Sequence, residues 1–319
     1  MPVAPLDTAN KRNLLQIIQD ASAELGLAVP TSVVGNTDDQ TVQMLSIAQR
    51  EGNEFSISAD GKGGWQELIN QYSFLTATVT GVTGNTTLGS RIITNIPSTA
   101  SLVANRYSLS GAGLPNQAII TSVDSATQVT IDRPCTATGT AVALTAGQKA
   151  YTFPSGIARF IDQSWWDGSY RWQLLGPLSS QEKQVLKYGI SPTGPRRRFW
   201  IEDNLVWIDP TPTTANDVIA FDYYSEYWAR ASDGLTEKAR FTADTDYYVL
   251  DDDCMVMGIK WRFLRAKGLD YGEEFNSYME RKNMMIARNG GRRSLPINAR
   301  NQGQRLLNQD NIPDTGFGS

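Results

Sequence analysis

The 319-residue chain contains no histidine. Histidine is the side chain that proteins use most often for general acid–base catalysis near neutral pH. Its absence excludes Ser-His-Asp and Cys-His nucleophile arrangements within this chain, together with every metal site that needs an imidazole. The composition therefore favours a binding or structural protein, while enzymes that use only carboxylates, lysine or tyrosine remain open.

Cysteines are scarce and long apolar runs are absent from the sequence. Cys135 and Cys254 lie far apart and match no C-x-x-C pattern, so we expect two isolated reduced thiols and no zinc site made of cysteines. No charged segment followed by an apolar one opens the chain, and no run approaches the length of a membrane span. We therefore expect no signal peptide, no membrane partner, and a chain that is soluble and cytosolic when it is made.

Residues 76–148 are nearly devoid of charge. These 73 residues carry five charged side chains, no tryptophan, no phenylalanine and one tyrosine, Tyr107, but 22 serines or threonines. Their apolar residues come in short β-branched runs that Gly, Asn, Asp and Pro interrupt, which is typical of a small all-β module. A flexible linker is the alternative, but the alternation of apolar and polar residues over 128–132 disfavours it.

The flanking regions are charged, rich in aromatics and helical in pattern. Apolar residues at helical spacing, with capping residues before them and glycines after them, predict helices. The predicted helices span residues 8–25, 37–52, 180–188, 252–267 and 271–288. Between them, alternating residues and a turn predict a β-meander over about 198–224.

These elements predict an α+β fold. We expect the N-terminal and C-terminal helices to close on one another as a four-helix-bundle-like core, formed by residues 1–75 and 149–290. The meander lies in the middle of that core, and the small all-β module of residues 76–148 is inserted into it. Residues 291–319 have too few apolar side chains to pack and are expected to form an extended C-terminal tail.

Carboxylates offer no convincing catalytic or metal site. Asp251, Asp252 and Asp253 are adjacent and could chelate a hard cation, but the start of a helix independently favours aspartate. We expect helix capping there, and neither a metal nor a cofactor elsewhere. A carboxylate-based hydrolase is kept as a minor alternative, because two facing carboxylates can cleave a glycosidic bond.

Aromatic side chains crowd one short segment, in which Trp165, Trp166, Tyr170 and Trp172 fall within eight residues. Core packing between sheet and helices is one interpretation. The other is a subunit or tail interface, because Trp and Tyr are enriched where proteins bind one another.

Basic residues are unevenly distributed. Residues 281–319 carry a net charge of +5, which leaves −9 for residues 1–280. Arg196, Arg197 and Arg198 form a second basic cluster. Both groups could simply be solvated, or they could contact nucleic-acid phosphates or an acidic partner.

Three stretches resemble the head–tail adaptor, or head completion, proteins of tailed bacteriophages. They are Pro30–Asp38 (PTSVVGNTD), Leu174–Glu182 (LLGPLSSQE) and Ala243–Tyr271, which includes GIKWRFLRAKGLDY. The all-β module departs from a minimal adaptor, which would lack it.

The resemblance implies a non-enzymatic structural protein of the virion, located at the capsid–tail junction after assembly in the host cytoplasm. Such adaptors form a ring, usually of twelve copies, that joins the portal protein to a tail nozzle or tail-completion protein. The ring extends the channel through which packaged DNA passes, so contact with DNA is non-specific and would involve Arg196–Arg198.

In several relatives a C-terminal extension binds the portal. By position, that role would fall here to Arg288, Arg292, Arg293, Leu295, Ile297, Arg300, Arg305, Leu306 and Leu307. We expect the inserted module to project outward from the ring. An alternative function is host attachment or carbohydrate binding through residues 76–148, although the near absence of aromatics there disfavours a sugar platform.

Overall fold

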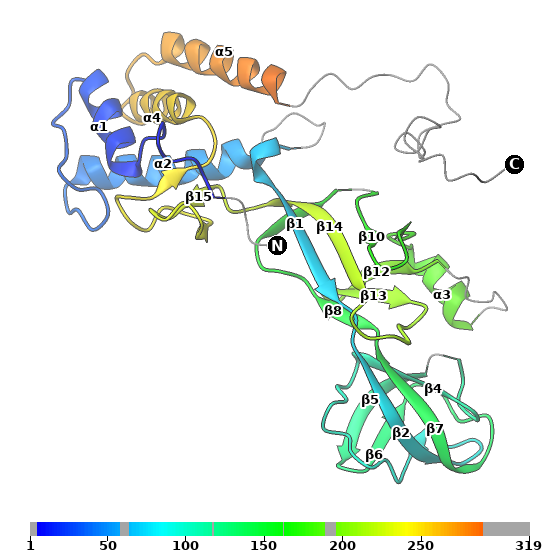
Figure 1. Cartoon of the computed structure of the whole chain (residues 1–319). Coiled ribbons are helices and arrows are strands. Elements are labelled where there is room, and N and C mark those ends of the chain that lie inside the picture. The colour runs from blue at the N-terminus through cyan, green and yellow to red at the C-terminus, as the bar shows by residue number, and fades with distance from the viewer. Residues whose placement is uncertain (1–4, 58–63, 117, 162, 189–195, 290–319) are drawn as a thin grey trace, which may run out of the picture.

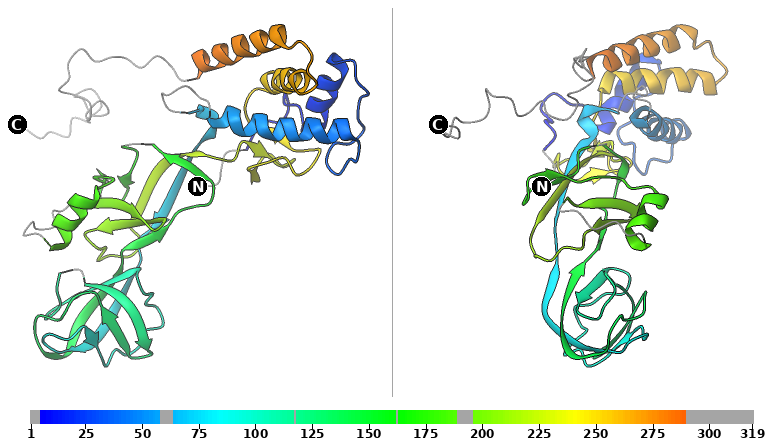
Figure 2. Two further views of the ribbon diagram at one scale, coloured as in Figure 1. Left: turned by 180° about the vertical axis from the view of Figure 1, so that it is seen from behind. Right: turned by 90° about the vertical axis from the view of Figure 1, so that its right-hand side faces the viewer.

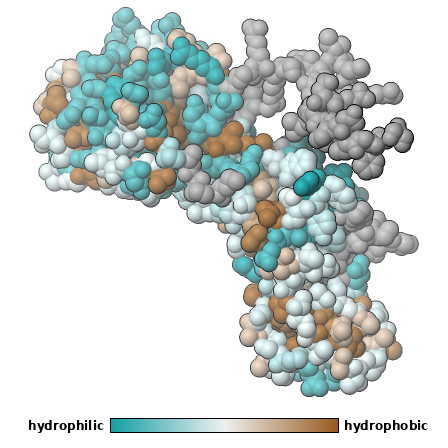
Figure 3. Space-filling view, viewed as in Figure 1, coloured by the Kyte–Doolittle hydropathy of each residue, from teal (hydrophilic) through white to brown (hydrophobic). Residues whose placement is uncertain are grey.

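The computed structural model describes residues 5–57, 64–116, 118–161, 163–188 and 196–289. The molecule is elongated and has three parts (Figure 1). A helical part lies at one end, a middle part is built from two small sheets, and a β unit lies at the opposite end, as Figure 2 shows from two further sides. On the side seen in Figure 3, the helical part carries many hydrophilic residues, whereas the β unit is mostly of intermediate hydropathy. The chain enters the β unit directly from the middle part through consecutive strands, and returns the same way.

The helical part is built from helices at both ends of the described chain. They are α1 (Leu14–Glu24), α2 (Asp39–Ile57), α4 (Asp252–Ala266) and α5 (Gly272–Arg288). Ile17, Ile18 and Ile259 are fully buried between them, because apolar residues at helical spacing face a shared core. A small sheet of β15 (Ala229–Arg230), β16 (Glu237–Lys238) and β17 (Tyr247–Tyr248) closes this part.

Two glycines let α2 approach its neighbours closely. A Cβ on Gly258 of α4 would lie 2.6 Å from the carboxyl carbon of Glu51, and one on Gly52 would lie 2.5 Å from the indole of Trp228. Both distances are shorter than van der Waals contact, so larger residues there would push α2 away. Glycine at these positions is therefore a packing requirement.

The middle part contains two antiparallel sheets. In the first sheet, β1 (Ile69–Leu75) pairs with β14 (Val218–Ser225). A 3-10 turn, Gln66–Leu68, precedes β1. β14 also pairs with β9 (Ile157–Phe160) and with β10 (Trp166–Asp167). The hairpin partner of β10 is β11 (Trp172–Gln173). The second sheet has β12 (Arg198–Glu202), β13 (Leu205–Asp209) and β8 (Ala150–Thr152), with α3 (Ser180–Tyr188) beside it.

Aromatic rings fill the core of the middle part. The indole of Trp165 is stacked between Phe199 and Phe221, with ring centroids 4.2 Å and 3.9 Å away. Phe160 packs on both Trp165 and Phe221. Since Phe221 belongs to the first sheet and Phe199 to the second, Trp165 joins the two sheets.

The β unit, residues 78–148, is one antiparallel sheet with its own core. Its strands follow the order β2 (Thr78–Thr86), β7 (Gly139–Gln148), β4 (Tyr107–Gly111), β5 (Ala118–Ser125), β6 (Gln128–Ile131), β3 (Ile92–Ile93). Ile93, Leu109, Ile120 and Val129 are completely buried, and the core contains one aromatic side chain, Tyr107. Aliphatic burial therefore stabilises this unit.

The predicted fold class is wrong. The described residues are mostly β, with several antiparallel sheets and five helices, and they do not form a helical-bundle core that carries a small β domain. The helices at the two ends of the chain do share a hydrophobic core, but it occupies only one end of the molecule. The bundle prediction failed because it assigned no secondary structure to the residues that form β1 and β8–β11.

The predicted meander over 198–224 is also wrong in its pairing. β12 and β13 form a hairpin, but β13 continues to β8, while β14 belongs to the other sheet and pairs with β1 and β10. Strands that follow one another in sequence need not be neighbours in a sheet, because an earlier strand can pair over more residues. β14 pairs with β1 over seven residues.

Three of the five helices lie close to the predicted positions, while α1 begins six residues later and α2 ends five residues later than predicted. α3, α4 and α5 lie within one residue of the expected ends, α1 begins at Leu14 after the Asn13 cap, and α2 continues past Gly52 to Ile57. Cys135 and Cys254 are free and buried in different cores. In the part of the chain that the structure describes, no helix combines the length and the apolar character that a bilayer crossing requires.

Candidate binding surfaces

The aromatic segment that the sequence singles out divides between core and surface. Trp165 is buried, whereas Trp166, Tyr170 and Trp172 are 45%, 50% and 44% exposed. Tyr170 and Trp172 lie together, with ring centroids 6.5 Å apart. Trp172 is directly opposite Asp167 in the β10–β11 hairpin, while Trp166 is opposite Gln173, so the strand alternation sends Trp166 to the other face.

Trp166 belongs to an apolar sheet surface. It pairs with Ala220 of β14, which pairs with Ser73 of β1, so these three side chains share the outer face of the sheet. The next pair on that face is Leu75 and Val218, which are also exposed. We call Leu75, Trp166 and Val218 the outer apolar face.

The arginine cluster has three different environments. Arg197 is buried, and its guanidinium donates to Asp167 at 2.6 Å and to Asp217 at 2.5 Å. Its guanidinium carbon also lies 5.0 Å from the centroid of the Tyr170 ring. Arg197 therefore supports the hairpin from inside, with its charge already paired by carboxylates.

The neighbouring arginines are more accessible. Arg196 is exposed and donates to the carbonyl oxygen of Gln173 at 3.1 Å. Arg198 is half-buried at the first position of β12. Of the three arginines that we predict to contact DNA or an acidic partner, Arg196 is therefore the most accessible, and the buried Arg197 interrupts the cluster.

The segment that we predict to bind the portal is described only at its first residue. Arg288 is exposed at the end of α5. The remaining candidates all lie outside the described residues: Arg292, Arg293, Leu295, Ile297, Arg300, Arg305, Leu306 and Leu307. The last described residue, Asn289, accepts a hydrogen bond from the backbone of Gln66 and donates one to the carbonyl oxygen of Gly64. The last described residue therefore lies beside the residues that precede β1.

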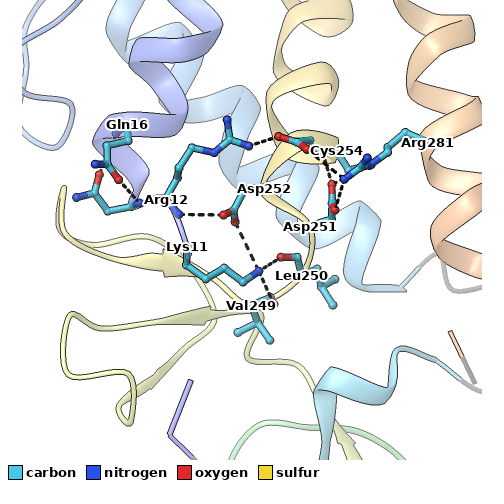
Figure 4. A network of polar contacts seen from close by, with 11 residues as sticks. Lys11, Arg12, Gln16, Val249, Leu250, Asp251, Asp252, Cys254 and Arg281 are labelled. Atoms are coloured by element: carbon cyan, nitrogen blue, oxygen red, sulfur yellow. Dashed lines mark hydrogen bonds and ion pairs between the residues drawn. The ribbon is translucent and has the colours of Figure 1, made fainter. Parts of the chain in front are cut away.

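Of the three adjacent aspartates, Asp251 caps α4, and all three bind basic side chains around the start of this helix (Figure 4). The side chain of Asp251 accepts from the backbone of Cys254 at 2.8 Å and from Arg281 of α5 at 2.7 Å. Asp252 accepts from the backbone of Arg12 at 2.9 Å, and Asp253 accepts from both the Arg12 and Arg281 guanidinium groups.

This network joins the start of α1 to α4 and α5. Lys11 donates to the carbonyl oxygens of Val249 and Leu250, as Figure 4 shows. Burial raises the pKa of Asp252, and the nearby Lys11 and Arg12 oppose that change. Among the described residues no group of acidic or cysteine side chains is arranged to hold a metal ion.

A cleft of about 800 Å³ lies where the β unit meets the middle part. The β unit contributes Ile119 and Arg133, and α3 contributes Lys183. The opposite wall contains Trp200 of β12 and Trp207 of β13, which are directly paired across the hairpin and whose rings are stacked with 7° between their planes. We call it the seam cleft.

A buried ion pair lies in the wall of the seam cleft. Lys149, between β7 and β8, binds Asp209 with 3.2 Å between Nζ and Oδ1, and both side chains are almost fully buried. Burial lowers the pKa of Lys149 and the attraction of Asp209 opposes it. The Lys149 ammonium also lies 5.5 Å from the centroid of the Trp200 ring.

The sequence did not identify this cleft. Its residues come from six separate stretches between Asn105 and Asp209, so no local motif marks it. One local signal existed in Lys149, which is the first charged residue after Arg133 and precedes the apolar residues of β8. An isolated lysine next to a buried strand needs a carboxylate partner.

No protein-family model matches the chain, and a comparison with curated proteins found no significant match.

Proposed function

We propose that the chain is a non-enzymatic virion protein of a tailed bacteriophage, a ring-forming adaptor that joins the portal to the tail. The proposal rests on the resemblance of three stretches to head–tail adaptor proteins. Its partners would be the portal protein, a tail nozzle or tail-completion protein, other copies of the chain, and packaged DNA that passes through the channel.

Two of the resembling stretches touch in the structure. The carboxylate of Asp244, from the stretch Ala243–Tyr271, accepts hydrogen bonds from the backbone N–H groups of Val33 and Val34, at 3.1 Å and 2.7 Å. Val33 and Val34 belong to the stretch Pro30–Asp38. If the resembling stretches belong to one structural unit, they are expected to lie together in the fold. This contact therefore supports the resemblance.

The observation that carries the proposal is the outer apolar face. Leu75, Trp166 and Val218 expose large apolar side chains side by side on a regular sheet. Isolated exposed apolar residues are ordinary, but a contiguous group on one face is typical of a protein–protein contact. A ring subunit needs such a surface for its neighbour.

Mass measurement of the protein alone and after mixing with the portal protein of its virus tests the proposal. We expect a ring of several copies to form on the portal. A variant that ends at Arg293 should keep the folded core, measured by its melting temperature, and lose attachment. Failure of the full chain to bind the portal, or normal attachment of the shortened chain, would contradict the respective part of the proposal.

A further inference from the structure

The seam cleft has the size and composition of a ligand-binding site. Pockets for small ligands occupy about 300–1,000 Å³ and often lie between domains. At about 800 Å³, the seam cleft lies in this range and at such a junction. Its function is separate from the adaptor surface, because the outer apolar face is built from β1, β10 and β14, which contribute no residue to the cleft.

The aromatic side chains of the seam cleft belong to the middle part and not to the β unit. The β unit itself offers only Tyr107, which is buried. Trp200 and Trp207 belong to the middle part and line the same cleft as Ile119 of β5, and only 7% and 8% of their surface is exposed. The junction therefore places a small apolar area, made of the half-buried Ile119 and the exposed part of the two indoles, beside the polar side chains of the β unit.

Six of the seven charged side chains that line the cleft form ion pairs with one another, and the seventh, Asp203, is exposed in the turn between β12 and β13. Besides Lys149 and Asp209, Arg133 lies 3.4 Å from Asp132 and Lys183 lies 2.8 Å from Glu202. A charged ligand would have to compete with one of these pairs and with the cost of desolvating it. A neutral ligand with many hydroxyl groups can instead share the outer N–H groups and carboxylate oxygens.

Amide side chains add hydrogen-bonding groups at the rim. Asn105 and Asn116 from the β unit and Gln184 from α3 line the cleft and are exposed. Each amide can both donate and accept, which matches hydroxyl groups that do the same. Polar groups that fix orientation around an apolar wall are the usual composition of a specific ligand site.

We propose that the seam cleft binds a neutral oligosaccharide. The C–H face of a pyranose ring is apolar and packs against Ile119 and the small exposed part of the two indoles, while its hydroxyl groups bind the rim amides and the ion pairs. A sugar bound here contacts both the β unit and the middle part, so either part alone binds it weakly.

The test uses the full chain and a panel of neutral oligosaccharides built from glucose, galactose, mannose and N-acetylglucosamine, with sialylated and sulfated sugars beside them. Titration calorimetry measures affinity. Thr121→Trp places a large side chain at the rim and should abolish binding, whereas Thr136→Trp, on an exposed site outside the cleft, should leave it unchanged.

A smaller change gives a matched pair on one helix. Gln184→Ala removes one amide from the rim and should weaken binding by about three- to tenfold. Gln181→Ala, also exposed on α3 but outside the cleft, should have no effect. The melting temperature of all four variants shows that the fold is retained.

Binding of a neutral sugar that Thr121→Trp abolishes and Thr136→Trp preserves would support the proposal. Three results would overturn it: no neutral sugar of the panel binds at millimolar concentration, the anionic sugars bind best, or the cleft variants bind as tightly as the unchanged chain. None of these results bears on assembly with the portal, which is measured separately.

Discussion

The helical part and the β unit reach a stable core by different means. In the helical part Glu51 is buried, and its carboxylate accepts hydrogen bonds from Arg262 Nε at 2.6 Å and from the hydroxyl of Tyr278 at 2.7 Å. In the β unit the core is aliphatic, and a charged residue such as Asp124 binds Ser122 and Thr130 at the surface.

The two parts differ in the interactions that keep their helices or strands in place. Buried charge is stabilising only when each group keeps its partner, so the helical part depends on a specific set of pairs. The β unit depends on strand pairing and on apolar area, which are insensitive to the loss of any one surface charge. The helical part should therefore be sensitive to charge and pH, and the β unit to cavities.

The largest effect is expected from Glu51→Ala. This change leaves the Arg262 guanidinium with Glu54 alone and the Tyr278 hydroxyl without its acceptor, and should cost about 3–5 kcal/mol of unfolding free energy. Urea unfolding measures it. The control Glu54→Ala removes a half-exposed partner of the same arginine and should cost less than about 1 kcal/mol. Equal costs would contradict the importance of the buried pair.

A core truncation should weaken the β unit by a somewhat smaller amount. Ile120 is completely buried, so Ile120→Ala should cost about 2–4 kcal/mol through lost apolar contact and a cavity. Val123→Ala, on the same strand but exposed, is the matched control and should change little. Hydrogen exchange of residues 118–131 locates the loss. An equal loss in α4 would show that the two parts do not differ as we describe.

Alkaline pH should weaken the helical part before the β unit. Burial raises the pKa of Cys254, of Tyr248 and of Tyr278. Because the folded state holds these protons more tightly than the unfolded chain, their contribution is complete below the ordinary values of 9.0 and 10.0 and falls as pH rises through them.

We expect a loss of about 1 kcal/mol in the helical part by about pH 9.5. Hydrogen exchange that resolves residues 252–266 from residues 118–131 measures this loss, after correction for the intrinsic rate at each pH. Cys254→Ala should reduce the pH dependence of α4. Earlier opening of the β unit would contradict the assignment.

The same contrast explains what could be predicted from the sequence. Helices such as 252–267 repeat an apolar pattern over several turns and are capped by local residues, here Asp251, so their limits are encoded locally. Strands such as β10 are only two residues long and are defined by partners far away in sequence, here β14. No local pattern contains that information, so the sheets of the middle part were missed.

The candidate sites also could be predicted only as far as their residues are close in sequence. Trp166 and Trp172 could be recognised as a cluster because they are close in sequence, but the alternation that separates them onto two faces depends on the β10–β11 register. In the sequence, Arg197 belongs to a basic cluster that is typical of a surface contact. Its burial is explained only by Asp167 and Asp217, which bind its guanidinium in the folded chain. The seam cleft required the packing of two sheets and α3.

The outer apolar face gives the most direct test of the adaptor proposal. We predict that Trp166→Ser combined with Leu75→Ser leaves the melting temperature nearly unchanged, since both side chains are exposed, but prevents ring formation on the portal, measured by particle mass. Leu88→Ser, at an exposed apolar site on the β unit, is the control and should assemble normally. Rings of normal mass from the double variant would contradict the assignment of this face as the subunit contact.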